Sequence, residues 1–232
     1  MTKINNTLFY YIDDNGKKVF FDTKNTSAFD GGNEGSVYKV GGLAIKVIEK
    51  FSISFEEADY FRTFTNLKRT RIPKHILFSI ADDSFAGYTD LFLSRINRIA
   101  NFKCSNFLRD YLNILDDVTL LAAGGICTCD SIDENFLFDK DNLYLLDCSR
   151  WYISEPNSKI DIEKDNRYEV AEGIAQILTN PLRVGTNIAI AMTPFCDALI
   201  KNEESPLEFH KRLSKELGSY PTFGDYSINK KC

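Results

Sequence analysis

Two acids and an amide frame a short stretch of this chain, residues 129–149. Asp130 and Asn135 lie five positions apart, and Asp147 follows Asn135 after twelve more. Carboxylate and amide oxygens accept protons and hydrogen bonds and bind cations, so this set could act on a hydroxyl group or hold a metal ion. The alternative is a surface hairpin whose acids are merely solvated.

Two short strands are predicted to position these three residues. The runs 136–138 and 143–146 are apolar and rich in strand-forming residues, and the polar residues 139–142 between them are typical of a turn. The sequence therefore predicts a strand-turn-strand unit with Asp130 before the first strand and Asp147 directly after the second.

Two further hairpins are predicted upstream. Asn15-Gly16 lies between the apolar runs 8–12 and 18–21, and Asn-Gly is a strong hairpin-turn signal. Gly41-Gly42 lies in the same way between residues 29–40 and the run 43–48. The first 50 residues are thus expected to be largely β-structure.

The second of these hairpins resembles part of the protein-kinase-like superfamily. Gly32-x-x-Gly35-x-Val37 is similar to the latter part of the glycine-rich loop G-x-G-x-x-G-x-V, and Ala44-Ile45-Lys46 is similar to V-A-I-K. Glycine suits such a loop because a backbone without Cβ can approach phosphates closely. The Asp, Asn and Asp of the later hairpin resemble the same family's catalytic loop and metal-binding Asp in their spacing.

Several flanking residues depart from the family pattern. The His-Arg that precedes the catalytic Asp is replaced by Thr128-Cys129, and the Phe-Gly after the metal-binding Asp is replaced by Cys148-Ser149. Asp30 stands in place of the first loop glycine, where a carboxylate would repel phosphate. None of the departures at residues 128–129 and 148–149 removes a group that would touch ATP or metal.

The resemblance implies a role for each matching residue. Lys46 would orient the phosphates of ATP, and Asp130 would position or deprotonate the acceptor hydroxyl. Asn135 and Asp147 would hold Mg²⁺. The nucleotide would also meet residues of the glycine hairpin and the hinge, namely Gly32, Gly35, Val37, Ala44 and Leu93.

A helix is predicted over residues 55–68 with Ser54 as its cap, and the resemblance implies that it carries the partner of Lys46. We expect this partner to be Glu57 and not Glu56, because Glu57 shares a helix face with Phe61 and Phe64. The alternative for both glutamates is an exposed first-turn acid favoured by the helix dipole.

The implied fold is α+β: a bilobed, protein-kinase-like fold. Residues 1–94 would form the N-terminal lobe, an antiparallel sheet with one helix and an N-terminal β-hairpin. Residues 95–232 would form a reduced, mainly helical C-terminal lobe that carries the catalytic hairpin. Apolar periodicity and strand-forming runs add strands at 76–80 and 88–93 and helices at 106–123, 168–178, 187–200 and 206–217.

Composition limits the classes of partner. A net charge of −5 argues against general nucleic-acid binding, and no apolar run approaches the ~18 residues typical of a membrane span. Six cysteines without a CxxC pair argue against a zinc site and favour a reducing compartment. A cytoplasmic protein is expected, and the resemblance extends to small atypical kinases and to kinase effectors that bacteria secrete into a host cytosol.

Two functions therefore compete. The first is an ATP- and Mg-dependent phosphotransferase whose acceptor is a protein Ser/Thr hydroxyl, or else a small molecule. The second is a pseudokinase, a module that docks a protein partner with or without nucleotide. Retention of Lys46, Glu57, Asn135 and the two acids favours the first, whereas Asp30 and the altered flanking residues favour the second.

Overall fold

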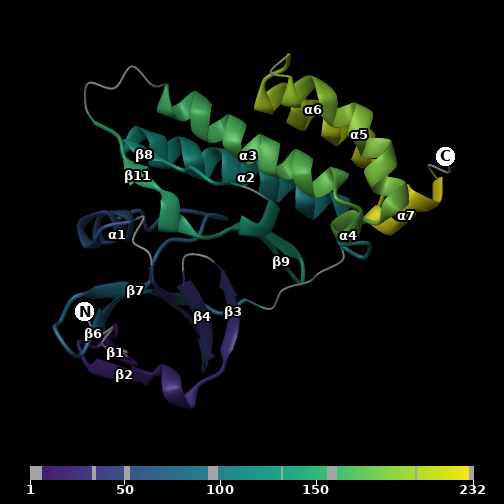
Figure 1. The fold of residues 1–232 in the computed structure, drawn as a ribbon. Coiled ribbons are helices and arrows are strands. Elements are labelled where there is room, and N and C mark those ends of the chain that lie inside the picture. The colour runs from purple at the N-terminus through teal and green to yellow at the C-terminus, as the bar shows by residue number, and fades with distance from the viewer. Residues whose placement is uncertain are drawn as a thin grey trace. The chain divides into compact units, whose positions relative to one another are not determined.

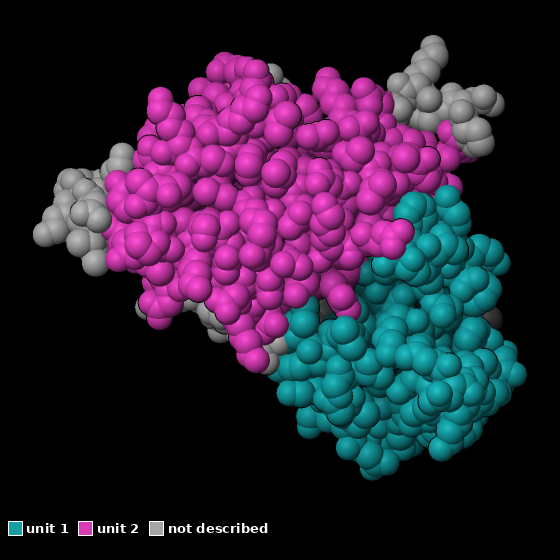
Figure 2. Space-filling model, turned by 180° about the vertical axis from the view of Figure 1, so that it is seen from behind, with its two compact units in different colours: residues 1–65, 72–93 teal, residues 66–71, 94–232 magenta. Residues whose placement is uncertain are grey.

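The computed structural model describes residues 7–32, 35–49, 53–93, 99–131, 133–155, 161–201 and 203–229. The chain divides into two compact units (Figure 2). Unit 1 comprises residues 1–65 and 72–93, and unit 2 comprises residues 66–71 and 94–232. The tip of the predicted glycine loop, residues 33–34, and the predicted lobe boundary at residue 94 lie outside the described residues.

Unit 1 is built on a curled, seven-stranded antiparallel sheet (Figure 1). Its strand order is β2-β1-β6-β7-β5-β4-β3, and a short 3-10 turn over Thr23–Asn25 follows β2. The strands are β1 (Leu8–Ile12), β2 (Lys18–Asp22), β3 (Ala28–Gly32), β4 (Gly35–Val40), β5 (Leu43–Ile48), β6 (His75–Ser79) and β7 (Phe85–Leu91).

Glycine turns set the register of the two predicted hairpins. Gly16 joins β1 to β2 with φ of 76°, and Gly41 joins β4 to β5 with φ of 58°, a backbone conformation that other residues adopt only at a cost. Both hairpins are confirmed, and one face of the sheet buries an apolar core. That core comprises Phe9, Tyr11, Phe21, Ile45, Leu77 and Ala86.

The helix of unit 1, α1 (Phe55–Phe61), starts where the sequence predicts but ends early. Ser54 caps it: the Glu57 N–H donates to the Ser54 hydroxyl oxygen at 3.1 Å, and the Ser54 N–H donates to the Glu57 carboxylate at 2.9 Å. The prediction that the helix runs to residue 68 is wrong, because the chain leaves unit 1 at residue 66 and its next amides bond elsewhere.

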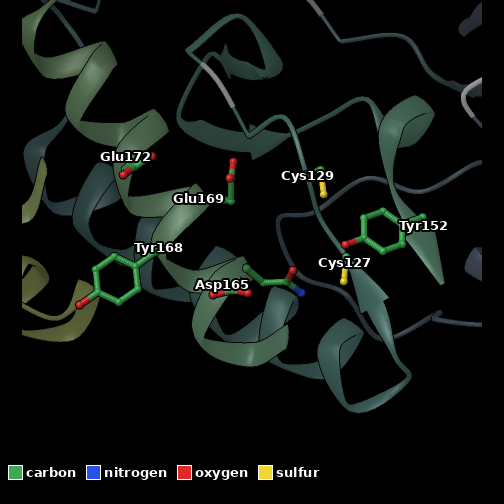
Figure 3. Close-up of a pocket in the computed structure, with 8 residues that line it drawn as sticks. Cys127, Cys129, Tyr152, Asp165, Tyr168, Glu169 and Glu172 are labelled. Atoms are coloured by element: carbon green, nitrogen blue, oxygen red, sulfur yellow. The ribbon is translucent and has the colours of Figure 1, made fainter. Parts of the chain in front are cut away.

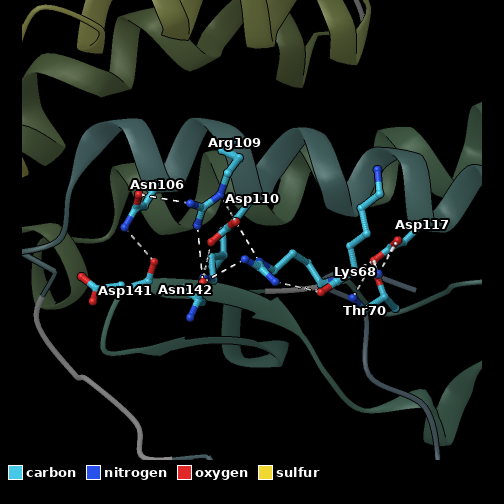
Figure 4. Close-up of polar contacts among 10 residues, drawn as sticks. Lys68, Thr70, Asn106, Arg109, Asp110, Asp117, Asp141 and Asn142 are labelled. Atoms are coloured by element: carbon cyan, nitrogen blue, oxygen red, sulfur yellow. Dashed lines mark hydrogen bonds and ion pairs between the residues drawn. The ribbon is translucent and has the colours of Figure 1, made fainter. Parts of the chain in front are cut away.

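Residues 66–71 attach to unit 2 through a buried carboxylate (Figure 4). Asp117 is fully buried and accepts hydrogen bonds from three successive backbone N–H groups, those of Lys68 at 2.8 Å, Arg69 at 2.6 Å and Thr70 at 2.7 Å. The segment also pairs with residue Leu145, whose N–H donates to the Arg69 carbonyl at 2.9 Å. A continuing helix would have used these same N–H groups internally.

Unit 2 is mainly helical. Its helices are α2 (Cys104–Ala123), α3 (Ile162–Thr179), α4 (Pro181–Val184), α5 (Thr186–Ile200), α6 (Pro206–Leu217) and α7 (Phe223–Asn229). Two small antiparallel pairs join β8 (Ile126–Cys127) to β11 (Tyr152–Ile153) and β9 (Phe136–Asp139) to β10 (Asn142–Leu145). Single 3-10 turns, η2 (Asp133–Asn135) and η3 (Cys148–Arg150), flank β9 and β10.

Helix α2 supplies the centre of the unit 2 core. Its side chains at helical spacing, among them Phe107, Tyr111 and Leu115, are fully buried, and the Phe107 ring stacks on Phe138 of β9 at 6.3 Å. The predicted fold class is confirmed: an α+β protein with an antiparallel N-terminal sheet and a mainly helical C-terminal part. Across the part of the chain that the structure describes, no helix is both long and apolar enough to span a membrane.

Candidate functional site

Three of the predicted nucleotide-binding residues share one face of the unit 1 sheet. Val37 on β4 lies directly opposite Lys46 on β5, and Ala44 is two residues before Lys46 on the same strand. Successive side chains on a strand alternate between faces, so these three lie on the face opposite Ile45, which belongs to the buried core. All three are half-buried.

The glycines beside Lys46 are required by neighbouring strands. A Cβ at Gly35 would lie closer than 3.0 Å to the Val47 carbonyl oxygen of β5, and a Cβ at Gly87 would meet the Lys46 carbonyl oxygen as closely. Both neighbours are backbone atoms that cannot rotate away. Close strand packing therefore explains Gly35 without any ligand, and its contact with phosphate stays a prediction.

The other unit 1 predictions are placed as follows. Gly32 ends β3 and pairs with Gly35, and Leu93 is half-buried just beyond the end of β7. Glu57 is the third residue of α1, where its carboxylate accepts hydrogen bonds from the Ser54 N–H and O–H, both at 2.9 Å. Its role as the partner of Lys46 also stays a prediction.

In unit 2, hydrogen bonds bring Asp130, Asn135 and the end of β10 together. The Asn135 side-chain N–H donates to the Asp130 carbonyl at 2.6 Å, and the Asn135 carbonyl accepts from the Leu146 N–H at 2.8 Å. Asp147 is the next residue, and its carboxylate accepts from the Ser149 N–H at 3.2 Å and the Ser149 hydroxyl at 2.7 Å. Asn135 thus bridges the loop before β9 and the segment after β10.

Both acids have strained backbones. Asp130 has φ of 68° and Asp147 has φ of 64°, in the left-handed region that non-glycine residues rarely adopt. Asp83 and Lys140 have positive φ as well, but they lie in the short connections between β6 and β7 and between β9 and β10. Such strain outside turns persists where the surrounding structure imposes it, and it is characteristic of functional sites.

A guanidinium group lies beside the first acid. Arg150, in η3, is 3.5 Å from the Asp130 carboxylate, whose side chain is 25% exposed. The Asn135 side-chain N–H is 3.4 Å from the other Asp130 carboxylate oxygen. The Asp130 carboxylate is therefore accessible to solvent while positive or donor groups lie on two sides of it.

Helix α3 holds the loop that carries Asp130, residues 128–131. The fully buried amide of Asn166 accepts from the Thr128 N–H at 2.8 Å and donates to the Ile126 and Val118 carbonyls at 2.8 and 3.3 Å. The loop also closes on itself, because the Ser131 hydroxyl donates to the Thr128 carbonyl at 3.1 Å.

A cavity of about 260 Å³ opens next to this loop (Figure 3). Cys127, Cys129 and Tyr152 line one side of it, and α3 lines the other with Asp165, Asn166, Tyr168, Glu169 and Glu172. Burial raises the pKa of the Cys129 thiol, and a hydrogen bond to Cys127 raises the pKa of Tyr152 to about 12. The Cys129 thiol is consequently protonated at neutral pH and is a poor nucleophile.

One carboxylate of this cavity, that of Glu169, has a raised pKa. Burial raises the pKa of Glu169, and Glu172 raises it further, while a hydrogen bond from the Ser131 N–H lowers it; Asp130 and Asp165 add to the increase. The interaction with Asp130 places the cavity and the first acid in one electrostatic environment.

The oxygen donors of the site suit magnesium better than a structural metal. Within the described ranges, no group of three or more His, Cys, Asp or Glu side chains is arranged to hold a metal ion. Mg²⁺ is usually held by only one or two protein oxygens, while phosphates and water complete its shell. That Asn135 and Asp147 form a donor pair of this kind stays a prediction.

In fold, the chain is similar to a kinase. The structure of the Legionella pneumophila Lpg2603 kinase bound to IP6 aligns over 98% of this chain and 90% of its own length, with a TM-score of 0.47 and 11% sequence identity. No protein-family model matches the chain, and no curated protein matches it either. Identity at this level carries no information on activity, ligand or substrate.

Sequence reasoning missed Arg150, Asn166 and Glu169 at this site. Arg150 has a weak sequence signal: it follows Asp147 by only three positions, and the 3-10 turn η3 brings its guanidinium beside Asp130. The two α3 residues have none, because each meets the 128–131 loop from 38 or more positions away, as the contact between Thr128 and Asn166 shows.

Proposed function

We propose that the protein is an ATP- and Mg-dependent phosphotransferase that acts on a protein Ser/Thr hydroxyl. The observation that supports this most is the set of hydrogen bonds through which Asn135 connects Asp130 to the residue before Asp147. Three polar residues with kinase-like spacing are thereby held in one place, and the two acids keep a strained backbone there.

Asp130 would accept the proton of the acceptor hydroxyl. Its partly exposed carboxylate is within reach of a group in solvent, and Arg150 beside it would keep the carboxylate oriented. Asn135 and Asp147 would hold Mg²⁺, which when bound supplies charge neutralisation to the phosphates. The Ser149 N–H and hydroxyl fix the Asp147 carboxylate before any ion is bound.

Unit 1 would contribute the groups that bind ATP. Lys46 would donate to the phosphates, and Val37 and Ala44 on the same sheet face would contact the base. Gly32, Gly35 and Leu93 complete the proposed nucleotide contacts, with Glu57 holding Lys46. These roles follow from the sequence resemblance and the shared strand face.

Phosphate transfer from γ-labelled ATP to a Ser/Thr peptide library, and to the protein itself, tests the proposal. We expect Asp130→Ala to lower the transfer rate by about 10²-fold or more, as for loss of a general base. Asp147→Asn should reduce transfer to background at every Mg²⁺ concentration up to the solubility limit of the nucleotide complex.

Asp141→Asn is the matched control, because it removes an exposed carboxylate from the turn of the same hairpin. It should leave the rate within twofold of the wild type. Absence of any transfer by the wild type, or equal loss in the Asp141 and Asp130 variants, would contradict the proposal.

One observation favours the pseudokinase alternative. The Glu57 carboxylate accepts two hydrogen bonds from Ser54 in the capping box of α1, so part of its capacity is used by the helix end. A protein-binding module would need no more from Glu57 than this. In that case label transfer would be absent while the biological function survived Asp130→Ala.

A further inference from the structure

We propose that Gly173 of α3 is a positioning residue for Asp130, because it lets the 128–131 loop lie directly on the helix. This inference rests on the proposed role of Asp130 as the group that receives the acceptor proton. It concerns a residue that has no contact with nucleotide, metal or acceptor in the proposed mechanism.

One face of α3 meets the loop at successive turns. Asn166, Glu169 and Gly173 are spaced by three and four residues, so they share that face. Asn166 accepts from the Thr128 N–H at 2.8 Å, and the Glu169 carboxylate accepts from the Ser131 N–H. The loop is thus bonded to the helix at both ends.

At Gly173 the contact is steric. A Cβ there would lie closer than 3.0 Å to the Ser131 carbonyl oxygen and 2.5 Å from the ring of Phe136. The first of these is a backbone atom, so no rotamer change can make room. Any side chain at position 173 must push the Ser131 peptide away from the helix.

The choice of glycine here opposes the helix's own preference. Gly173 lies in the interior of an 18-residue helix, where glycine costs about 1 kcal/mol relative to alanine. It does not have positive φ, which would otherwise justify glycine. Close approach of the loop is the remaining physical reason for its presence.

Displacement of Ser131 would be passed to Asp130, the preceding residue. Asp130 is held on its other side by the 2.6 Å bond from Asn135 to its carbonyl, and its φ of 68° leaves little freedom to absorb a shift. A misplacement of ~1 Å in a reacting group can lower a rate by about 10²-fold.

The test is Gly173→Ala in the full chain. We expect the turnover rate for phosphate transfer to fall by about 10²-fold while the dissociation constant for ATP changes by less than twofold. Hydrogen exchange at the Ser131 amide should become at least tenfold faster. Val170→Ala, a truncation at a fully buried position of the same helix, is the control for general loss of stability. It should neither lower turnover by this factor nor speed exchange at the Ser131 amide tenfold.

A second pair of variants applies if Gly173→Ala fails to fold. Glu169 lines the cavity but part of its side chain reaches solvent, so its substitution is compatible with folding. Glu169→Leu removes the acceptor for the Ser131 N–H, so exchange of that amide should become faster and turnover should fall. Glu169→Gln keeps an acceptor oxygen, so it should retain most of the protection from exchange and most of the turnover.

Unchanged Ser131 exchange in Gly173→Ala, or equal behaviour of the two Glu169 variants, would overturn the inference. If the wild type transfers no phosphate, the proposed function fails. The exchange measurements would still decide whether α3 positions the loop.

Discussion

Asp130 is a single residue that its surroundings hold in an unfavourable backbone conformation. A left-handed backbone costs roughly 1–2 kcal/mol for a residue with a side chain, although Asp tolerates it better than most. The hydrogen bond from the Asn135 side chain to the Asp130 carbonyl, at 2.6 Å, is a short contact that holds this backbone. Among the described residues, the carboxylate itself makes only long contacts, of 3.4 Å with Asn135 and 3.5 Å with Arg150.

This imbalance leads to a prediction about two truncations of the same side chain. Asp130→Gly should be about 1 kcal/mol more stable than Asp130→Ala, because glycine adopts positive φ freely and alanine does not. Urea unfolding of both variants measures the difference, and both should show the same large loss of phosphate transfer. Equal unfolding free energies would mean that the loop relaxes out of the left-handed region once the carboxylate is gone.

For single residues, the sequence predicted only those relations that depend on short spacing along the chain. Asn135 follows Asp130 closely enough for one loop to bring them together, and Asp147 follows a hairpin whose length fixes its return. Gly173 and Asn166 were out of reach, because a helical residue that contacts a loop some forty positions earlier leaves no periodic signal.

Among the elements, the segment 66–71 shows most clearly where local patterns fail. Apolar residues at helical spacing predicted a helix through residue 68, yet helix α1 ends at Phe61. The competing partner is Asp117, a fully buried carboxylate 47 to 49 positions away that collects three backbone N–H groups. The hairpins, by contrast, were predictable because an Asn-Gly or Gly-Gly turn is formed by neighbouring residues and needs no distant partner.

We expect Asp117→Ala to lower the free energy of unfolding by about 3 kcal/mol or more, since buried donors left without an acceptor cost about 1–3 kcal/mol each. Asp116→Ala is the adjacent control. Asp116 pairs with the Lys68 ammonium at 3.3 Å, but both side chains are 55% exposed, so its loss should cost less than about 0.5 kcal/mol. Chemical denaturation compares the two, and similar losses would show that Asp117 is not the anchor.

Asp110 extends the same anchor along α2. It is fully buried and accepts from the Arg69 guanidinium at 2.7 Å and from the Leu143 N–H at 2.9 Å, so one carboxylate joins the 66–71 segment to β10 (Figure 4). A buried acid is stable only when its charge is compensated in this way. The two acids therefore act together on a segment that has no secondary structure of its own.

For the whole molecule, the proposal requires residues of both units to act on the same nucleotide. Mg-ATP at 100 times its dissociation constant should then stabilise the protein by about 2.7 kcal/mol, which for a chain of this size raises Tm by about 5–10 °C. Lys46→Met in unit 1 and Asp147→Asn in unit 2 should each reduce the shift measured by scanning fluorimetry. A full shift in either variant would contradict joint binding.

The fold class was predictable at this scale because each half has its own composition of elements, strands and glycine turns first and long amphipathic helices afterwards. The order of strands in the sheet was not, since β1 pairs with β6 across more than sixty residues of intervening chain.

The path of residues 66–71 has a consequence for anyone who wishes to produce the two halves separately. A cut after residue 93 would leave this hexapeptide on the N-terminal fragment, with its amides exposed to water. The C-terminal fragment would retain Asp117 in an apolar interior without the three amides that bind it, and Asp110 without Arg69, although the Leu143 N–H would still donate to Asp110. Neither fragment should fold stably by itself, and mixing the two should restore the hydrogen bonds between residues 68–70 and the acids of α2.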